Sequence, residues 1–139
     1  MNSKELQQQL AGVELFAGLS KRTIGQVASS GRFTEHADGH EVIVEGAGAT
    51  GFHLITSGQA RVTSGGAVRR TLGVGDYFGE ISVIDGRPRS ASVEAIENLS
   101  TLAIAPAVVN GLIEDNPAFA RRLLVLLCAR LREAERRSS

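Results

Sequence analysis

Residues 75 to 93 read Gly-Asp-Tyr-Phe-Gly-Glu-Ile-Ser-Val-Ile-Asp-Gly-Arg-Pro-Arg-Ser-Ala-Ser-Val. Gly79 precedes a short apolar segment that predicts a helix, and the free amides and positive dipole end at a helix N-terminus favour an anion. A carboxylate beside such a site, here Glu80, can accept a hydrogen bond from a sugar hydroxyl. Arg89 begins the next expected strand, and its guanidinium can bind two phosphate oxygens. The stretch therefore predicts a phosphate cradle with an acceptor for a sugar hydroxyl.

The chain around this stretch, from residue 31 to residue 105, alternates apolar and polar residues between frequent turn residues. Twelve of the 16 glycines lie between Gly31 and Gly86, where turns require positive φ. Period-two alternation is typical of half-buried strands, and seven or eight short strands predict a sandwich or barrel. The expected strands are residues 32–36, 41–44, 52–56, 60–63, 68–72, 90–95 and 99–104, with turns that include Ser57-Gly58 and Glu97-Asn98.

Helical periodicity lies on both sides of the barrel region. Residues 1–30 predict short helices, and Ser20 is placed to cap the one that begins at residue 21. Residues 106–139 predict two more helices, one beginning at Pro106 and one after Asn116, because proline suits the first helical position. The last helix carries an apolar stripe of Phe119, Leu123, Leu126, Leu127 and Leu131. The predicted fold class is mainly β with flanking helices, and a further short helix lies within the barrel region.

Length and composition exclude several classes of protein. A chain of 139 residues, 42% hydrophobic, has room for one domain, which we place at residues 1–139. Fifteen basic and fifteen acidic residues give no net charge to hold a polyanion, so nucleic acid is not an expected partner. The single Cys128 excludes an internal disulfide. No segment is suited to span a membrane or to act as a secretory signal, so a cytoplasmic location is expected.

Catalytic and metal chemistry are not predicted. The three histidines, His36, His40 and His53, have no carboxylate or cysteine at ligand spacing, so we expect them in strands or at the surface. The serine-glycine pairs lack the histidine and aspartate of a nucleophile elbow. Cys128 is interpreted as a small packing residue on an apolar helix. We therefore expect a binding module with no catalytic residue, no metal ion and no cofactor.

Residues 75–93 resemble the phosphate-binding cassette of cyclic nucleotide-binding domains, the modules of catabolite-activator-type regulators and protein kinase A regulatory subunits. The family pattern is Phe-Gly-Glu, a small residue two positions on, and Pro-Arg followed by a small residue and alanine before a strand. The chain has each part without a gap, at residues 78–80, 82 and 88–91. The similarity extends to residues 15–19, 45–46, 58 and 75–76, and it implies that the sheet is a β jelly-roll barrel. Ala47 stands where an acidic residue is frequent, and His53 where an aromatic residue is frequent.

The resemblance implies roles for the cassette, residues 78–91. Glu80 would accept from the ribose 2′-hydroxyl, and Arg89 would pair with the cyclic phosphate. Ser90 favours cAMP, with cGMP as the alternative, since threonine there tends to favour guanine. The base would contact strand residues and be covered by the C-terminal helix, from which Arg130 could stack on the purine. The expected ligand-binding residues are Phe78, Gly79, Glu80, Ile81, Ser82, Arg89, Ser90, Ala91, Val62, Leu72 and Arg130.

Three functions remain open at this point. The first is a regulatory module in which cyclic nucleotide binding moves the C-terminal helix. The second is the ligand-binding part of a catabolite-activator-like transcription regulator, or of another multidomain protein, whose output domain is absent from this sequence. The third is a barrel that binds no nucleotide and serves as an interaction surface. The leucine stripe and six arginines after residue 120 make a homodimer through the last helix, or an effector protein, the expected protein partner.

Overall fold

The computed structural model describes residues 2–43, 46, 51–87 and 90–138. They group into two compact units. The sheet unit comprises Ser29–Asn110, and the helical unit comprises Met1–Ala28 together with Gly111–Ser139. None of the described helices is long and apolar enough to cross a membrane.

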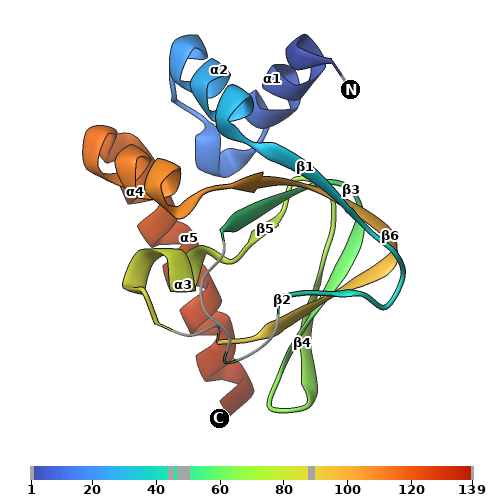
Figure 1. Ribbon diagram of the computed structural model, residues 1–139. Coiled ribbons are helices and arrows are strands. Elements are labelled where there is room, and N and C mark those ends of the chain that lie inside the picture. The colour runs from blue at the N-terminus through green and yellow to red at the C-terminus, as the bar shows by residue number, and fades with distance from the viewer. Residues whose placement is uncertain (1, 44–45, 47–50, 88–89, 139) are drawn as a thin grey trace. The chain divides into compact units, whose positions relative to one another are not determined.

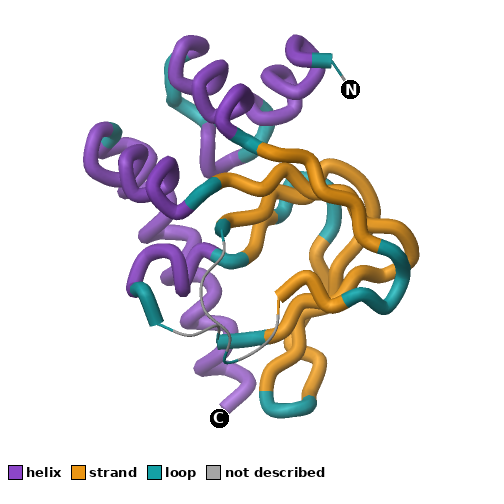
Figure 2. Tube along the Cα trace, in the orientation of Figure 1, coloured by secondary structure: helices purple, strands orange, loops and turns teal. Residues whose placement is uncertain are grey.

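The sheet unit is an antiparallel sheet whose described strands are ordered β1-β6-β3-β4, with β2 paired to β6 and β5 paired to β3. The sheet is strongly curved, as Figures 1 and 2 show. A single short helix, α3 (Glu80–Asp85), follows β5. The strands are β1 (Arg32–His36), β2 (Glu41–Ile43), β3 (Phe52–Ser64), β4 (Ala67–Leu72), β5 (Tyr77–Phe78) and β6 (Ser92–Ile104). The predicted class, mainly β with flanking helices, is confirmed.

Four of the expected short strands merge into two long ones: 52–56 and 60–63 form β3, and 90–95 and 99–104 form β6. β3 and β6 each run for 13 residues and pair with each other along most of their length. The expected turns at Ser57-Gly58 and Glu97-Asn98 are therefore wrong. Both lie inside the ladder, where the register shifts between Ser57 and Gln59. Such a shift is a β-bulge, which bends a strand without ending it.

Gly58 is what lets the two strands approach at the bulge. Its φ is 84°, and a Cβ there would overlap the carbonyl oxygen of Asn98. On the opposite strand, Glu97 has a φ of 57°, and its amide donates to the Asp38 carboxylate at 2.6 Å. The turn residues that the sequence shows are thus used for a bulge rather than for chain reversal.

The core of the sheet unit lies between the facing strands. Its residues come from β2, β3, β4, β5 and β6, and each is at most 6% exposed. Because these side chains alternate along their strands, period-two patterning places them on one side of the sheet. The cluster consists of Ile43, Ile55, Ala60, Val62, Leu72, Phe78, Val93, Ala95 and Leu99, with Val42 and Ala91 packed against it.

The helical unit begins with α1 (Ser3–Ala11), the single-turn 3₁₀ helix η1 (Glu14–Phe16) and α2 (Lys21–Ser30), which continues into the sheet unit. The Ser20 hydroxyl accepts from the Thr23 amide at 3.1 Å, so the predicted cap is confirmed. α4 (Pro106–Asp115) joins the two units, and α5 (Pro117–Ser138) ends the described chain. Within the unit, the rings of Phe16 and Phe119 stack with centroids 5.9 Å apart.

The apolar stripe of α5 is buried only at its beginning. Phe119 and Leu123 are 2% and 3% exposed, whereas Leu131 is 60% exposed. Leu124 and Val125 are also exposed. Cys128 is exposed too, so its interpretation as a packed residue is wrong. The stripe is therefore buried at Phe119 and Leu123, and α5 exposes the apolar side chains of Leu124, Val125 and Leu131 at the surface.

Candidate functional site

The cassette begins on the sheet and turns into a helix at Gly79. β5 pairs with β3, which places Phe78 opposite His53 and Tyr77 opposite Leu54. Gly79 has a φ of 91°, a conformation that favours glycine, and α3 begins at the next residue. The predicted glycine that opens a short helix is confirmed. The first residues of the cassette are fixed to the core, because Phe78 is only 2% exposed.

Glu80 is the first residue of α3, and it is 3% exposed. Burial of a carboxylate is costly unless hydrogen bonds compensate for the lost water. The first turn of a helix also favours a negative side chain. The carboxylate of Glu80 therefore lies inside the protein rather than at the surface.

The remaining cassette residues are placed to different extents. Arg89, together with Pro88, lies outside the described residues, so its predicted pairing with phosphate stays a prediction. Ile81 and Ser82 lie within α3. Ser90 is exposed and Ala91 is half-buried, and both directly precede β6, so the strand begins two residues later than expected.

Two of the expected base-contacting residues lie in the same cluster as the cassette. Val62 on β3 and Leu72 on β4 are both 6% exposed, and they share the core cluster with Phe78. Ala91 packs against this cluster. Arg130 is a half-buried residue of α5 in the helical unit. The sheet unit thus brings together Phe78, Ala91, Val62 and Leu72, and the role of Arg130 stays a prediction.

A polar connection that the sequence did not predict lies beneath the cassette. The ring of His53 stacks on the ring of Phe78, with centroids 5.0 Å apart and planes inclined by 6°. Its Nδ1 lies 3.0 Å from the hydroxyl of Thr101, which is fully buried. The signal in the sequence is the histidine at a position where the family has an aromatic residue. Its partner could not be inferred, because the two residues are 48 positions apart.

The other histidines form a pair near the surface. The rings of His36 and His40 stack with centroids 5.1 Å apart. Burial lowers the pKa of His36 below its ordinary value of 6.5, and the like charge of His40 lowers it further. Among the residues that the structure describes, no group of three or more histidine, cysteine or acidic residues could hold a metal ion.

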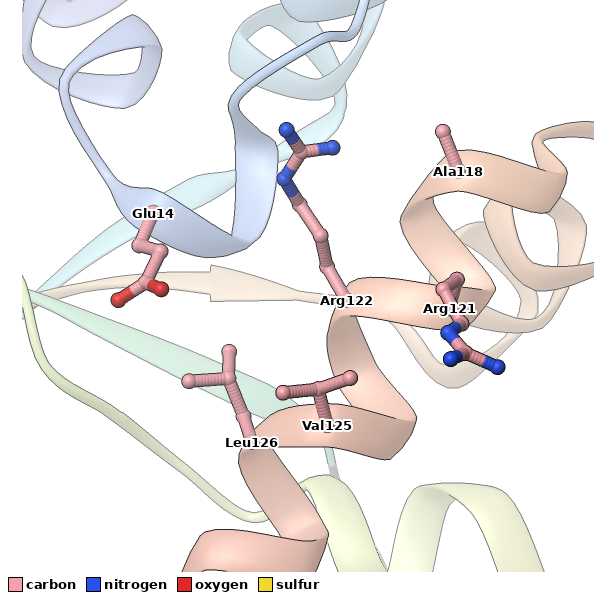
Figure 3. A pocket seen from close by; sticks show the side chains of 6 residues that line it. All are labelled: Glu14, Ala118, Arg121, Arg122, Val125 and Leu126. Atoms are coloured by element: carbon pink, nitrogen blue, oxygen red, sulfur yellow. The ribbon is translucent and has the colours of Figure 1, made fainter.

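A hollow lies in the helical unit, between η1 and α5. Figure 3 shows the carboxylate of Glu14 on one side and Arg122 extending from α5, while Arg121 points away. The hollow has a volume of about 340 Å³. None of the expected ligand-binding residues lines it; the lining residues are Glu14, Ala118, Arg121, Arg122, Val125 and Leu126.

Comparison with known proteins agrees with this geometry. The family model described as "Cyclic nucleotide-binding domain" matches residues 33–116, more than half of the chain. The cyclic AMP receptor protein of Thermus thermophilus is 34% identical over 131 residues, which cover 91% of this chain and 61% of that protein. The chain thus spans about three fifths of the length of this relative.

Two solved structures share the fold. The regulatory domain of Toxoplasma gondii PKA with cAMP has a TM-score of 0.82 at 22% identity, covering 92% of this chain and 50% of that one. The sensor domain of the transcriptional regulator DNR from Pseudomonas aeruginosa has a TM-score of 0.84 at 20% identity, covering 95% and 92%. These likenesses agree in fold with the family match and with the relative that is 34% identical, and the latter two lead to one conclusion: the chain belongs to the cyclic nucleotide-binding domain family and is a non-catalytic regulatory module.

Proposed function

We propose that this chain is a cytoplasmic cAMP sensor that binds the nucleotide in the sheet unit and changes the position of α5 in response. The observation that carries this proposal is the buried Glu80, which directly follows Gly79 at positive φ and Phe78 in the core. That arrangement supplies a hydroxyl acceptor next to a backbone bend that allows close approach of a phosphate. The relative described as a cyclic AMP receptor protein supports cAMP as the ligand.

Each cassette residue then has a specific task. Glu80 accepts from the ribose 2′-hydroxyl, and Arg89 pairs with the cyclic phosphate through charge-assisted hydrogen bonds. Backbone amides around Ser82 and Ala91 add further donors, and the exposed Ser90 lies where contacts to phosphate and purine meet. Val62 and Leu72 present the apolar surface for the base, which Arg130 covers from α5.

Calorimetry with cAMP, cGMP and a cyclic dinucleotide tests the ligand and the cassette together. We expect cAMP to bind most tightly and Arg89→Ala to weaken it by at least about tenfold, since a hydrogen bond to a charged group contributes about 1.5–3 kcal/mol. Glu80→Gln should reduce the affinity for cAMP less than Arg89→Ala does, because the amide oxygen can still accept from the ribose hydroxyl. Arg32→Ala, which removes an exposed arginine outside the cassette, is the matched control and should bind normally.

The result that overturns the proposal is equal cAMP affinity in the wild type and in Arg89→Ala. Binding of none of the three nucleotides would leave the interaction-surface hypothesis. Tighter binding of cGMP than of cAMP would keep the cassette and replace the ligand.

The movement of α5 requires a separate measurement. A ligand shifts a conformational equilibrium only if it binds one position of the helix more tightly than the other. We expect cAMP to slow hydrogen exchange of amides in α5 as well as in α3. Protection confined to the sheet unit would contradict a response of the helix.

A second candidate is the ligand-binding part of a longer transcription regulator. It is favoured by the 61% coverage of the cyclic AMP receptor protein of Thermus thermophilus. The mass of the protein in its native cells decides between the two candidates. A species well above 14.7 kDa that contains this sequence supports the longer regulator, and a species at that mass excludes it.

A further inference from the structure

Four side chains, which we call the relay, are joined by hydrogen bonds across three strands of the sheet unit. His53 Nδ1 on β3 lies 3.0 Å from Thr101 Oγ1 on β6. Thr101 Oγ1 lies 2.7 Å from Thr34 Oγ1 on β1, and the two threonines are direct partners in the strand register. Thr34 Oγ1 lies 3.0 Å from His36 Nε2. The relay leads from the buried His53 to the half-buried His36, which stacks on the exposed His40.

Counting protons shows that the two terminal histidines cannot act alike. Each of the three contacts needs one proton, and the two hydroxyls supply one each. The third proton must come from a ring nitrogen, either Nδ1 of His53 or Nε2 of His36. One ring therefore donates into the chain while the other accepts. If both rings were cationic, both would donate, and one threonine hydroxyl would have to direct its proton away from the other three side chains.

His53, the buried end of the relay, lies next to the first residue of the cassette. His53 is the register partner of Phe78 and stacks flat on its ring. Phe78 precedes Gly79 and Glu80, where the proposed nucleotide phosphate and ribose bind. His53 stands where the family frequently has an aromatic residue, so the protein keeps a flat ring at this position, but the ring can gain a proton.

Charged groups surround the relay on each neighbouring element. The carboxylate of Asp38, between the two surface histidines, accepts from the Glu97 amide, and Glu94 pairs with Arg61 at 3.2 Å. On β5, Tyr77 adjoins Phe78. The other ionisable groups on these elements are Arg32 and Glu35 on β1, Glu41 on β2, Arg69 and Arg70 on β4, Glu80 and Asp85 on α3, and the side chain of Glu97 on β6. The pKa of His36 is lowered by burial and by His40, so a histidine neighbour is the charge that acts on it.

We propose that His53 is a positioning residue of the cassette and that it shares one excess proton with His36, so that nucleotide affinity rises as pH falls. The inference rests on the proposed function. A cyclic phosphate is an anion, and an anion near the cassette favours a cationic ring at either end of the chain, most strongly at His53. Binding then takes up a proton, and by linkage the lower pH gives the tighter complex.

The first test uses the protein without nucleotide. Nitrogen-proton correlation spectra of the imidazoles report the charge and tautomer of each ring across a pH titration. As His36 becomes cationic, we expect His53 to remain neutral and to accept through Nδ1. Thr101→Val removes the relay hydroxyl, so the two rings should then titrate independently. Thr34→Val makes the same cut at a half-buried position, in case the Thr101 variant does not fold, and the exposed Thr71→Val is the matched control.

A tautomer of His53 that does not respond to His36 in the wild type would overturn the relay. The relay is also overturned if Thr101→Val and Thr34→Val both keep the wild-type response.

The second test is calorimetry with cAMP at about pH 5.5 and about pH 8, on either side of the ordinary histidine pKa. We expect the wild type to bind about threefold or more tightly at the lower pH. His53→Phe keeps the ring stack and removes the group that takes up the proton. Its affinity for cAMP should therefore differ much less between the two pH values. The phosphodiester keeps its single negative charge over this range, so the ligand contributes no titration of its own.

The outcomes separate the two proposals. Equal wild-type affinities at both pH values overturn the proton linkage and leave the proposed function intact. A pH response of His53→Phe equal to that of the wild type assigns the linkage to another group and also overturns this inference. Absence of cAMP binding at both pH values overturns the proposed function, and the linkage fails with it.

Discussion

Each of the two units contains a stacked ring pair that joins separate segments of the chain, and two of these pairs, one from each unit, differ in chemistry. In the helical unit, Phe16 and Phe119 are both hydrocarbon rings, and each is 2% exposed. In the sheet unit, Phe78 stacks on His53, whose nitrogen is bonded to Thr101. The first pair depends on buried apolar area, which pH does not change. The second adds a group whose charge can change, which suits a surface that supports a binding site.

The largest effect is expected where only apolar packing acts. Phe119→Ala should lower the free energy of unfolding by about 3–5 kcal/mol, because it removes a buried ring and leaves a cavity. Urea unfolding followed by circular dichroism measures it. Leu131→Ala, on the same helix but 60% exposed, should change stability by less than about 0.5 kcal/mol. Equal losses in the two variants would contradict the assignment of the α5 core to its first two turns.

Next in size is a backbone effect in the sheet unit. Gly58→Ala should lower the free energy of unfolding by about 3 kcal/mol, because the new Cβ meets the Asn98 carbonyl and the positive φ is strained for alanine. The comparison with Gly73→Ala is the control, since a Cβ at Gly73 meets nothing within 4 Å and its φ is not positive. Thermal unfolding of both variants decides the matter. A Gly58→Ala protein as stable as Gly73→Ala would mean that the bulge is not a constraint.

A smaller effect is expected from pH at the histidine pair. The folded pKa of His36 lies below its unfolded value of 6.5, so the unfolded chain binds a proton first as pH falls. At pH values above 6.5 the group contributes nothing. Stability is lost as pH falls from 6.5 toward the lower folded value, and the loss is complete below it. Urea midpoints across this range should fall less steeply for His36→Gln; an identical slope in both proteins would remove His36 as the cause.

The smallest effect is expected from a polar contact without burial. Arg61 and Glu94 are register partners on β3 and β6, joined at 3.2 Å, with side chains 39% and 35% exposed. Solvent screens such pairs, so a double-mutant cycle with alanine should give a coupling below about 1 kcal/mol. A larger coupling would show that the sheet unit depends on exposed charges more than the two ring pairs suggest.

Local signals predicted much of the architecture. Ser20 caps a helix, Pro106 and Pro117 begin helices, and Gly79 opens α3, because each depends on neighbours within a few residues. The predicted turn at Gly58 is wrong for the opposite reason. A glycine at positive φ fits both a hairpin turn and a bulge, and the choice depends on Asn98, 40 positions away in the chain.

The candidate site divides in the same way. The residue types and their order in the cassette are sufficient to predict a phosphate cradle and the family, since the backbone bend and the side-chain donors lie within one short segment. Long-range packing was needed to show that Glu80 is buried, that Phe78 rests on His53, and that Thr101 connects His53 to Thr34. These features depend on strand register, and register is fixed by which faces are buried across the whole sheet rather than by any one segment.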